Sequence, residues 1–145
     1  MGEPGARLRS RTPRRLKCQR RHSGHGSRWL RFCSGQAPPT ATRVQLIPAN
    51  VDTQPEQYCL LNVLRVVKCI DDAACEEVNH WTPEDGVPEK TGQYFSVYGL
   101  RIDPTQVGGV HLFRPWGWEI ALIVSESIKE AMQRPGVTGA RFEEV

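Results

Sequence analysis

The feature that most limits what this chain can fold into is an abrupt change of charge near residue 43. Residues 1–43 carry eleven basic side chains and a single acid, Glu3, which gives a net charge of +10. Residues 44–145 carry eight basic and fifteen acidic side chains, a net charge of −7. The overall charge of +3 describes neither part. A chain of 145 residues has room for one ordinary domain, so we expect a basic segment joined to one acidic domain.

The basic segment has few aliphatic residues, and these form no helical stripe. Self-repelling charge with little to bury predicts disorder. Its Arg, Gly, Pro and Ser residues are also what a GC-rich coding sequence yields when it is read in the wrong frame. We therefore expect residues 1–42 to be disordered or not genuine coding sequence, and residues 43–145 to form the folded domain.

No targeting or membrane segment is visible in the sequence. The start lacks the apolar stretch of a signal peptide and the amphipathic face of a transit peptide. The apolar run 120–124 is far shorter than the roughly 20 residues that span a bilayer. We expect a soluble cytoplasmic protein whose five cysteines, an odd number without framework spacing, are thiols.

Ordered texture begins at RVQLIPANV, which predicts a strand that Pro48 confines to an edge or a bend. The apolar stretch QYCLLNVLRVVKCID predicts a strand over 58–61, then a second strand or a short helix over 63–70, since short apolar runs do not separate the two by period. Residues 71–90 are acidic and rich in turn residues, with T-P-E-D-G as a turn, and predict a loop.

The next stretch, QYFSVYGLRID, predicts a strand with Tyr94, Ser96 and Tyr98 on one side. After a loop over 104–109 comes HLFRPWGWEIALIVS, which predicts a short strand over 110–113, a turn at R-P-W-G, and a strand over 118–124. Trp118 would begin that second strand and be buried. Trp116, in the turn, would either cover a sheet edge or reach a partner.

A helix follows, capped by Ser125 or Ser127, with Ile128, Ala131 and Met132 as its apolar face. Pro135 and Gly136 stop it, and 140–145 closes as a last strand with Phe142 inward. The expected fold class is α+β, with mostly antiparallel strands packed with a helix near the C-terminus.

No strong catalytic motif is present, because G-x-x-x-x-G-K-[ST], G-x-G-x-x-G, H-E-x-x-H and G-x-S-x-G are all missing. Cys18, His22, His25 and Cys33 offer zinc-ligand types, but their spacing matches no common finger and no apolar residues surround them. We expect no metal site, no cofactor and no catalytic residue.

A cysteine nucleophile with His80 or His111 as its base is the enzyme alternative. Cys59 and Cys69 lie in apolar runs, where cysteine usually packs as a small hydrophobe. Cys75 lies among acids, whereas a reactive thiolate needs an electropositive site. The pattern therefore favours a protein that is not an enzyme.

The two charged regions indicate two kinds of partner. The arginines of the basic segment, with Trp29 and Phe32, would be attracted to phosphates and bases, and a nucleic-acid-binding protein is the alternative function. The acidic stretch 71–89 is either a solvated loop or an anionic patch that meets a basic partner. Trp81 in its middle is the kind of residue that anchors interfaces.

Several pieces of residues 57–145 together resemble a bacterial immunity-protein family of polymorphic toxin systems, of the myxobacterial type, formerly a domain of unknown function. The matching pieces, in order, are QYCLLNVLRVVKCIDDAACEEV, WTPEDGVPEKTGQY, GLRIDP, HLFRPWGWEIALIVSESIKEAM and GVTGARFEEV. The resemblance implies a small cytoplasmic protein without catalytic residues that binds and neutralises a toxin encoded beside it. It also implies that 43–145 is the C-terminal part of a longer family domain, so that a missing strand would leave an unpaired edge.

We therefore expect a non-enzymatic immunity protein with a cognate toxin as its partner and neither membrane nor nucleic acid as a partner. The oligomeric state is open at this point. The candidate partner-binding residues are those of the acidic stretch and of the R-P-W-G turn: Glu76, Glu77, Trp81, Glu84, Asp85, Arg114 and Trp116.

Overall fold

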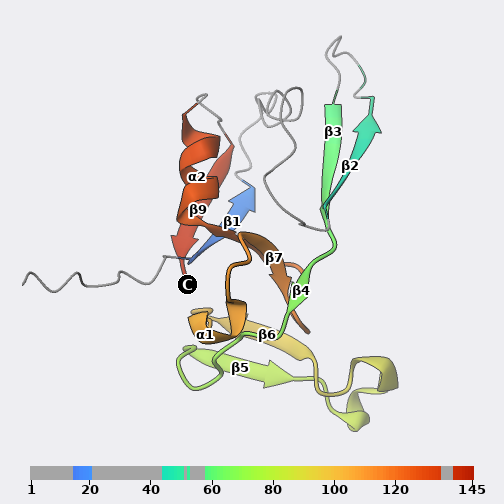
Figure 1. The fold of residues 1–145 in the computed structure, drawn as a ribbon. Coiled ribbons are helices and arrows are strands. Elements are labelled where there is room, and N and C mark those ends of the chain that lie inside the picture. Colours follow the sequence, from blue (N-terminus) through green and yellow to red (C-terminus); the bar gives the residue numbers. More distant parts are fainter. Residues whose placement is uncertain (1–14, 21–43, 51, 53–57, 135–138) are drawn as a thin grey trace, which may run out of the picture.

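The computed structural model describes residues 15–20, 44–50, 52, 58–134 and 139–145. Its centre is a five-stranded sheet in the order β4-β7-β8-β1-β9 (Figure 1). The strands are β4 (Val66–Val67), β7 (Leu112–Pro115), β8 (Leu122–Ser125), β1 (Arg15–Arg20) and β9 (Ala140–Glu144). All neighbours are antiparallel except β4 and β7, which run parallel.

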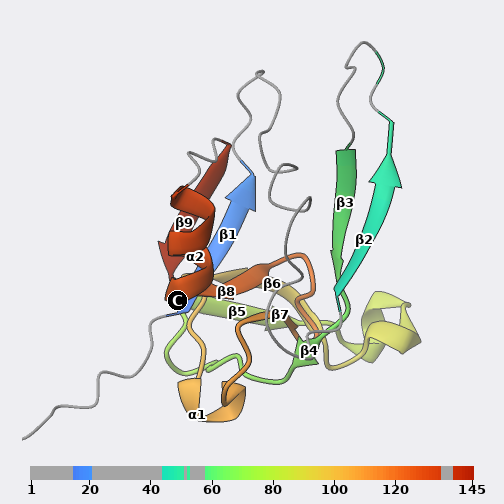
Figure 2. The same ribbon diagram turned by 45° about the horizontal axis from the view of Figure 1, so that its top comes forward.

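Two separate hairpins flank this sheet (Figures 1 and 2). One consists of β2 (Val44–Ala49) and β3 (Tyr58–Val63) and projects away from the remaining elements. The other consists of β5 (Glu77–His80) and β6 (Tyr94–Tyr98), with two short 3-10 turns, η2 (Pro83–Asp85) and η3 (Pro88–Lys90), at its tip. Two helices complete the fold, α1 (Pro104–Val107) and α2 (Glu126–Gln133).

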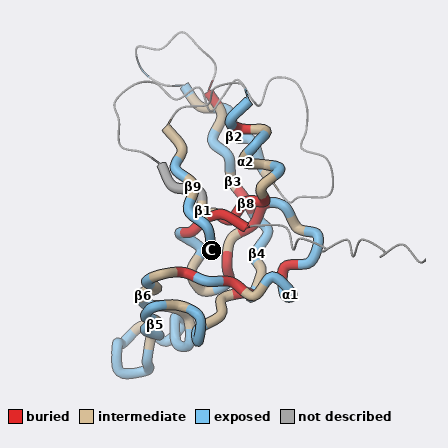
Figure 3. Tube along the Cα trace, turned by 90° about the vertical axis from the view of Figure 1, so that its left-hand side faces the viewer, coloured by how far each residue is buried: buried red, intermediate tan, exposed pale blue. Residues whose placement is uncertain are grey.

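The sheet buries both of its faces, as the alternation of β7 and β8 shows. Phe113 and Ile123, both fully buried, belong to a cluster with Leu100, Ile102 and Val107 from the β6–α1 side. Leu112 and Val124 point the other way, into a cluster to which α2 contributes Ile128. Figure 3 shows buried positions gathered along β8, at the middle of the molecule. The β5–β6 hairpin is therefore fixed on the core through one of its faces.

The fold class is the predicted one: mostly antiparallel strands with a helix near the C-terminus. β2, β3 and β9 lie where strands were predicted, and β3 continues two residues further, to Val63. Helix α2 begins after Ser125, whose Oγ accepts a hydrogen bond from the Ile128 N–H at 3.4 Å. Pro135 and Gly136 lie outside the described residues. Within those residues no helix is long and apolar enough to cross a membrane.

Several predicted boundaries were wrong. Residues 118–121 are not part of a strand, because two tight turns follow β7, with Trp118 N–H bonded to Pro115 O and Ala121 N–H bonded to Trp118 O. Strand β8 therefore starts only at Leu122. Trp118 is half-buried against the core cluster rather than inside a strand. The loop predicted over 104–109 contains α1, which begins at a proline after the Asp103 cap.

The basic segment differs from its predicted disorder at six residues. Strand β1 lies between β8 and β9 and pairs with both. Leu16 is buried in the cluster that holds Val124, and Lys17 Nζ lies 3.4 Å from Glu143 Oε2. Apolar burial and an acidic neighbouring strand thus compensate for the charge of this stretch. For the rest of residues 1–42, which lie outside the described part, the expectation stays a prediction.

Candidate protein-binding surface

The β5–β6 hairpin presents two different faces because side chains alternate along each strand. An irregularity in the pairing between Asn79 and His80 places both of these side chains on the same face. Val78 pairs with Val97, and Val97 packs on the core. The opposite face carries only polar and aromatic side chains, which we call the tyrosine face. Its members are Asp72, Glu77, Asn79, His80, Tyr94, Ser96 and Tyr98. The core thus holds the hairpin by one face and leaves the tyrosine face outward.

At one end of the tyrosine face, three side chains form a connected cluster. The Tyr94 hydroxyl donates a hydrogen bond to Asp72 Oδ1 at 2.5 Å. His80 Nε2 lies 3.5 Å from the other Asp72 oxygen, and its ring is 4.6 Å from the Tyr94 ring. Burial, followed by the bond to Asp72, raises the pKa of Tyr94 well above its ordinary value, so the phenol is a proton donor at neutral pH. The cluster fixes the Tyr94 ring in place.

At the other end, Glu77 lies opposite Tyr98, which is 59% exposed. The Asn79 amide donates to Glu77 Oε1 at 2.8 Å and to Ser96 Oγ at 3.0 Å. These bonds hold the carboxylate of Glu77 beside the open tyrosine ring. The result is an exposed aromatic side chain next to an oriented anion.

The turn at Trp116 and Gly117 docks against the inner end of this face. The prediction of a strand over 110–113 and a turn at R-P-W-G was wrong in its bounds, because Arg114 and Pro115 belong to β7. Gly117 has φ +75°, and a Cβ there would lie 3.1 Å from Tyr94 Cδ2, so only glycine fits without strain. The Gly117 carbonyl accepts the Tyr94 N–H at 3.1 Å. Lys68 Nζ lies 5.2 Å from the ring centroid of Trp116, which is 39% exposed. Trp116 thus lies in the turn that packs beside Tyr94.

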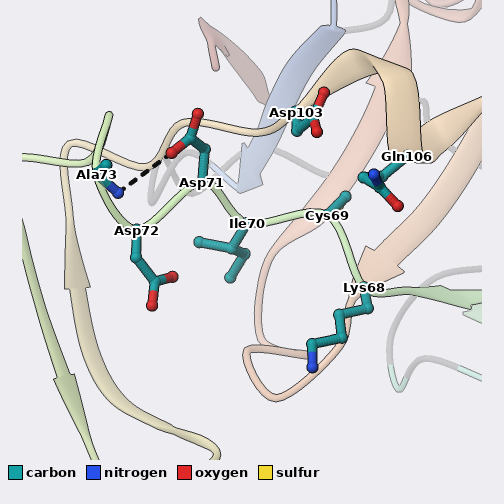
Figure 4. A pocket seen from close by; sticks show the side chains of 8 residues that line it. All are labelled: Lys68, Cys69, Ile70, Asp71, Asp72, Ala73, Asp103 and Gln106. Atoms are coloured by element: carbon teal, nitrogen blue, oxygen red, sulfur yellow. Dashed lines mark hydrogen bonds between the residues drawn. The ribbon is translucent and has the colours of Figure 1, made fainter.

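A pocket of about 550 Å³ lies between this region and α1, lined in part by Lys68, Asp72 and Asp103. Figure 4 shows the Lys68 and Asp72 side chains extending to one side of the chain and that of Asp71 to the other. Asp71 Oδ1 accepts the N–H groups of Ala73 and Ala74. Asp103 accepts the N–H and the hydroxyl of Thr105, and these bonds lower its pKa. Asp71 and Asp103 therefore hold the backbone in place.

The predicted partner residues fall into separate places. Glu77 belongs to the tyrosine face, and Glu76 is exposed just before it. Glu84 and Asp85 lie in η2, at the far end of β5 (Figure 1). Asp85 Oδ2 accepts hydrogen bonds from the N–H and the hydroxyl of Thr82. Both bonds lower the pKa of Asp85, and the bond from the N–H has the larger effect. The acidic stretch is therefore two groups, one at each end of β5.

Trp81 and Arg114, also predicted, lie off the tyrosine face. Trp81 packs edge-on against Phe95, with ring centroids 4.8 Å apart, and Lys90 Nζ lies 5.0 Å from its ring centroid. Arg114 Nη1 donates to Glu119 O at 2.6 Å, across the two turns that follow β7. Both residues thus make contacts that hold loops in shape.

The residues of the enzyme alternative lie in separate settings. His80 contacts Asp72 and Tyr94, whereas His111 Nδ1 lies 3.0 Å from Ser125 Oγ at the start of α2. Cys69 is 2% exposed, and burial followed by the charge of Asp103 raises its pKa to about 11. The Cys75 thiol donates a hydrogen bond to the Arg101 carbonyl, and its sulfur accepts one from the Arg101 N–H. The described contacts thus join neither histidine to a thiol.

Two of the basic residues on which the nucleic-acid alternative depends, Arg15 and Lys17, make contacts within the fold. Arg15 is 5% exposed, its Nη2 donates to Gly108 O at 3.0 Å, and its buried Nη1 has no hydrogen-bond partner. Burial lowers the pKa of this guanidinium. Lys17 is paired with Glu143. The remaining residues that carried this alternative, and the ligand set Cys18, His22, His25 and Cys33, lie outside the described side chains.

Sequence reasoning missed Asp72, Tyr94, Tyr98 and Lys68 as candidate site residues, and it considered His80 only as the base for a cysteine nucleophile. The alternation of Tyr94, Ser96 and Tyr98 was visible, but β5, the strand that completes their face, was predicted as loop. A four-residue strand next to a turn-rich stretch leaves a period too short to recognise. The signal available was Val78, which is apolar among polar neighbours.

The chain is thus an α+β domain whose β5–β6 hairpin exposes tyrosine, a residue that is enriched at protein interfaces. Its family is shown by comparison: the model of the immunity protein family Imm11 matches residues 42–145, and the chain belongs to this family. No curated protein and no solved structure matches the chain. The predicted resemblance to an immunity-protein family is confirmed, and such proteins act in general by neutralising a toxin without catalysis.

Proposed function

We propose that this protein binds a cognate toxin through the tyrosine face of the β5–β6 hairpin and neutralises it in the cytoplasm without catalysis. Membership in an immunity-protein family supports the general activity. The observation that carries the proposed site is Tyr98, which is 59% exposed and lies beside an oriented Glu77. Tyrosine is enriched at interfaces because it brings a large contact area with few rotatable bonds.

Preorganisation is the second support for this face. Tyr94 is held by Asp72 and His80, and Glu77 is held by Asn79, so little side-chain freedom remains to be lost on binding. Ordering a flexible side chain at an interface costs about 0.5–1.5 kcal/mol. A face whose hydrogen bonds already exist in the free protein avoids part of that cost.

Charge is the third support. Seven acids and one base lie within residues 71–90, and the whole of 44–145 has a net charge of −7. An acidic surface attracts a basic partner and raises the rate of association more than the affinity. The partner surface we propose is therefore basic, as the active site of a nuclease toxin would be.

Co-expression with the toxin encoded beside this gene tests the function. We expect the chain to restore growth and to copurify with that toxin. A chain that neither binds the toxin nor restores growth would sink the proposal.

A matched pair of variants tests the site. Tyr98→Ala removes an exposed ring from the tyrosine face, and Phe95→Ala removes a ring of similar exposure from the other side of the same strand. We expect Tyr98→Ala to raise Kd for the toxin about 30-fold, as an interface hot spot does, and Phe95→Ala to change it less than about threefold. Equal effects of the two variants would reject the tyrosine face, even if the protein protects the cell.

A further inference from the structure

The β2–β3 hairpin exposes an unusual concentration of apolar side chains. Its two strands carry Leu46, Ile47, Leu60 and Leu61, all exposed, and Leu60 reaches 61%. Exposed Leu64 and Val66 continue the surface toward β4. Exposed apolar side chains gathered on one element, rather than scattered singly, mark interaction sites in soluble proteins. The tyrosine face lies on the other hairpin, so this surface is separate from the proposed toxin site.

The base of the hairpin packs in a core cluster, and Tyr58 at the other end of β3 is 9% exposed. Val63 is buried in the cluster of Leu16, Leu112 and Val124, with its strand partner Val44 packed beside it. Beyond that pair the strands alternate, so Leu46 and Leu61 lie on one face and Ile47 and Leu60 on the other. A two-stranded hairpin with apolar groups on both faces is at most marginally stable in water, and a third or fourth strand is needed for independent stability.

The two edges of the hairpin differ. β2 contains Pro48, which has no N–H to donate and is a usual mark of an edge strand. β3, with the sequence YCLLNV, has no proline, no charge and no bulge in its pairing with β2. Among the described strands β3 pairs with β2 alone. Within the described residues, its outer edge therefore has unpaired backbone groups, and β3 has none of the features that prevent strand addition.

The chemistry of this edge fits a second copy of the same chain. Neither β2 nor β3 carries a charged side chain, so the hairpin offers nothing specific to the basic partner that suits the tyrosine face. A second copy presents the same uncharged edge, and two such edges related by a two-fold axis run antiparallel. Like-charge repulsion between the copies, which the acidic domain would otherwise cause, is absent at this edge.

We propose that the protein forms a dimer in which the two β3 strands pair antiparallel around a two-fold axis near Leu60 and Leu61, giving a four-stranded sheet β2-β3-β3-β2. The two copies of Leu60 then lie near each other on one face of that sheet, and the two copies of Leu61 on the other. Each hairpin thereby becomes part of a four-stranded sheet, which is more stable than two strands alone.

Sedimentation equilibrium of the full chain, from about 1 to 100 μM, tests the assembly. We expect a mass of twice 16.4 kDa at the upper concentrations. Leu60→Lys places like charges beside the axis, and we expect it to raise the dimer dissociation constant at least about 100-fold. Ile120→Lys is the matched control, because Ile120 is 77% exposed in the turns before β8, and it should leave the dimer unchanged. A monomer at all concentrations, or equal effects of both variants, would overturn the proposal.

Hydrogen exchange separates the β3 edge from other modes of association. We expect the β3 amides that point away from β2 to exchange more slowly as the protein concentration rises, and to lose this protection in Leu60→Lys. Concentration-dependent protection of β2 in place of β3, or of neither strand, would contradict the pairing. Circular dichroism spectra of the variants should match that of the parent chain, since Leu60 lies outside the core.

Discussion

Tyr94 and Asp72, 22 positions apart in the chain, are joined by a hydrogen bond of 2.5 Å between the phenol and a carboxylate oxygen. Asp72 lies in the turn that precedes β5, and Tyr94 begins β6. The bond therefore ties the acidic stretch to the hairpin and orients the ring around which the tyrosine face is arranged.

Tyr94→Phe should remove this bond while leaving the ring in place. Because both side chains are partly exposed, we expect the free energy of unfolding to fall by about 1 kcal/mol. The raised pKa of Tyr94 gives a second readout, since an ultraviolet pH titration of the parent should contain a late phenol ionisation that the variant lacks. A variant with unchanged stability and an unchanged titration curve would show that the bond does not form in solution.

The separation of the acidic stretch into two groups predicts two different effects of charge reversal. Glu77→Lys changes an anion on the tyrosine face and should lower both the association rate and the affinity for the toxin. Glu84→Lys changes an exposed charge in η2 and should lower mainly the association rate at low salt. Stopped-flow binding at two ionic strengths measures both. An unchanged rate at low salt in either variant would reject electrostatic attraction by this stretch.

Cys69 predicts a loss of stability in alkali. Burial and the charge of Asp103 raise its pKa from 9.0 to about 11 in the folded protein. Between these values the unfolded thiol is ionised and the folded thiol is not, so the free energy of unfolding should fall as the pH rises from 9 to 11. The stabilisation is fully present below pH 9.

Urea denaturation at pH 8, 9.5 and 10.5 measures this loss. Cys69→Ala should flatten the decline, and Cys75→Ala, which removes a half-buried thiol, should keep it. A decline of the same size in the Cys69 variant would assign it to other groups.

Strand β1 predicts that part of the basic segment belongs to the folded domain. Leu16 is 6% exposed in the cluster with Val63 and Val124, so Leu16→Ala should lower the free energy of unfolding by about 2–4 kcal/mol. Ile120→Ala, at a 77% exposed position, should change it by less than about 0.5 kcal/mol. If the two variants were equally stable, β1 would not be part of the sheet.

The sequence predicted the elements that have a long apolar pattern or a clear cap. Ser125 and the stripe of Ile128 and Met132 were sufficient for α2, and the apolar run around Leu60 was sufficient for β3. It did not predict β1, because the pairing of Lys17 with Glu143 joins residues that are far apart in the chain. A charge that a distant strand neutralises looks uncompensated in a local reading.

The sequence pointed to the region that contains the proposed surface, but to few of the residues on that surface. Counting acids selected the 71–90 region, but only Glu77 of the predicted set lies on the tyrosine face. Asp85 is engaged by Thr82 and Arg114 by Glu119, and such local bonds do not appear in a charge pattern. Tyr98 became a candidate only when β5 placed Glu77 opposite it.

The position of β1 has a consequence for the order in which this molecule can be built during translation. Arg15 of β1 pairs with Ser125 of β8, and Leu16 pairs with Glu144 of β9, so both neighbours of β1 in the sheet are synthesised more than 100 residues after it. At about 5–20 residues per second, synthesis of β8 is complete roughly 5–21 s after that of β1. The sheet can therefore close around β1 only after residue 144 has been synthesised, and a chain that stopped before Ala140 would lack one of the two strands that hold β1.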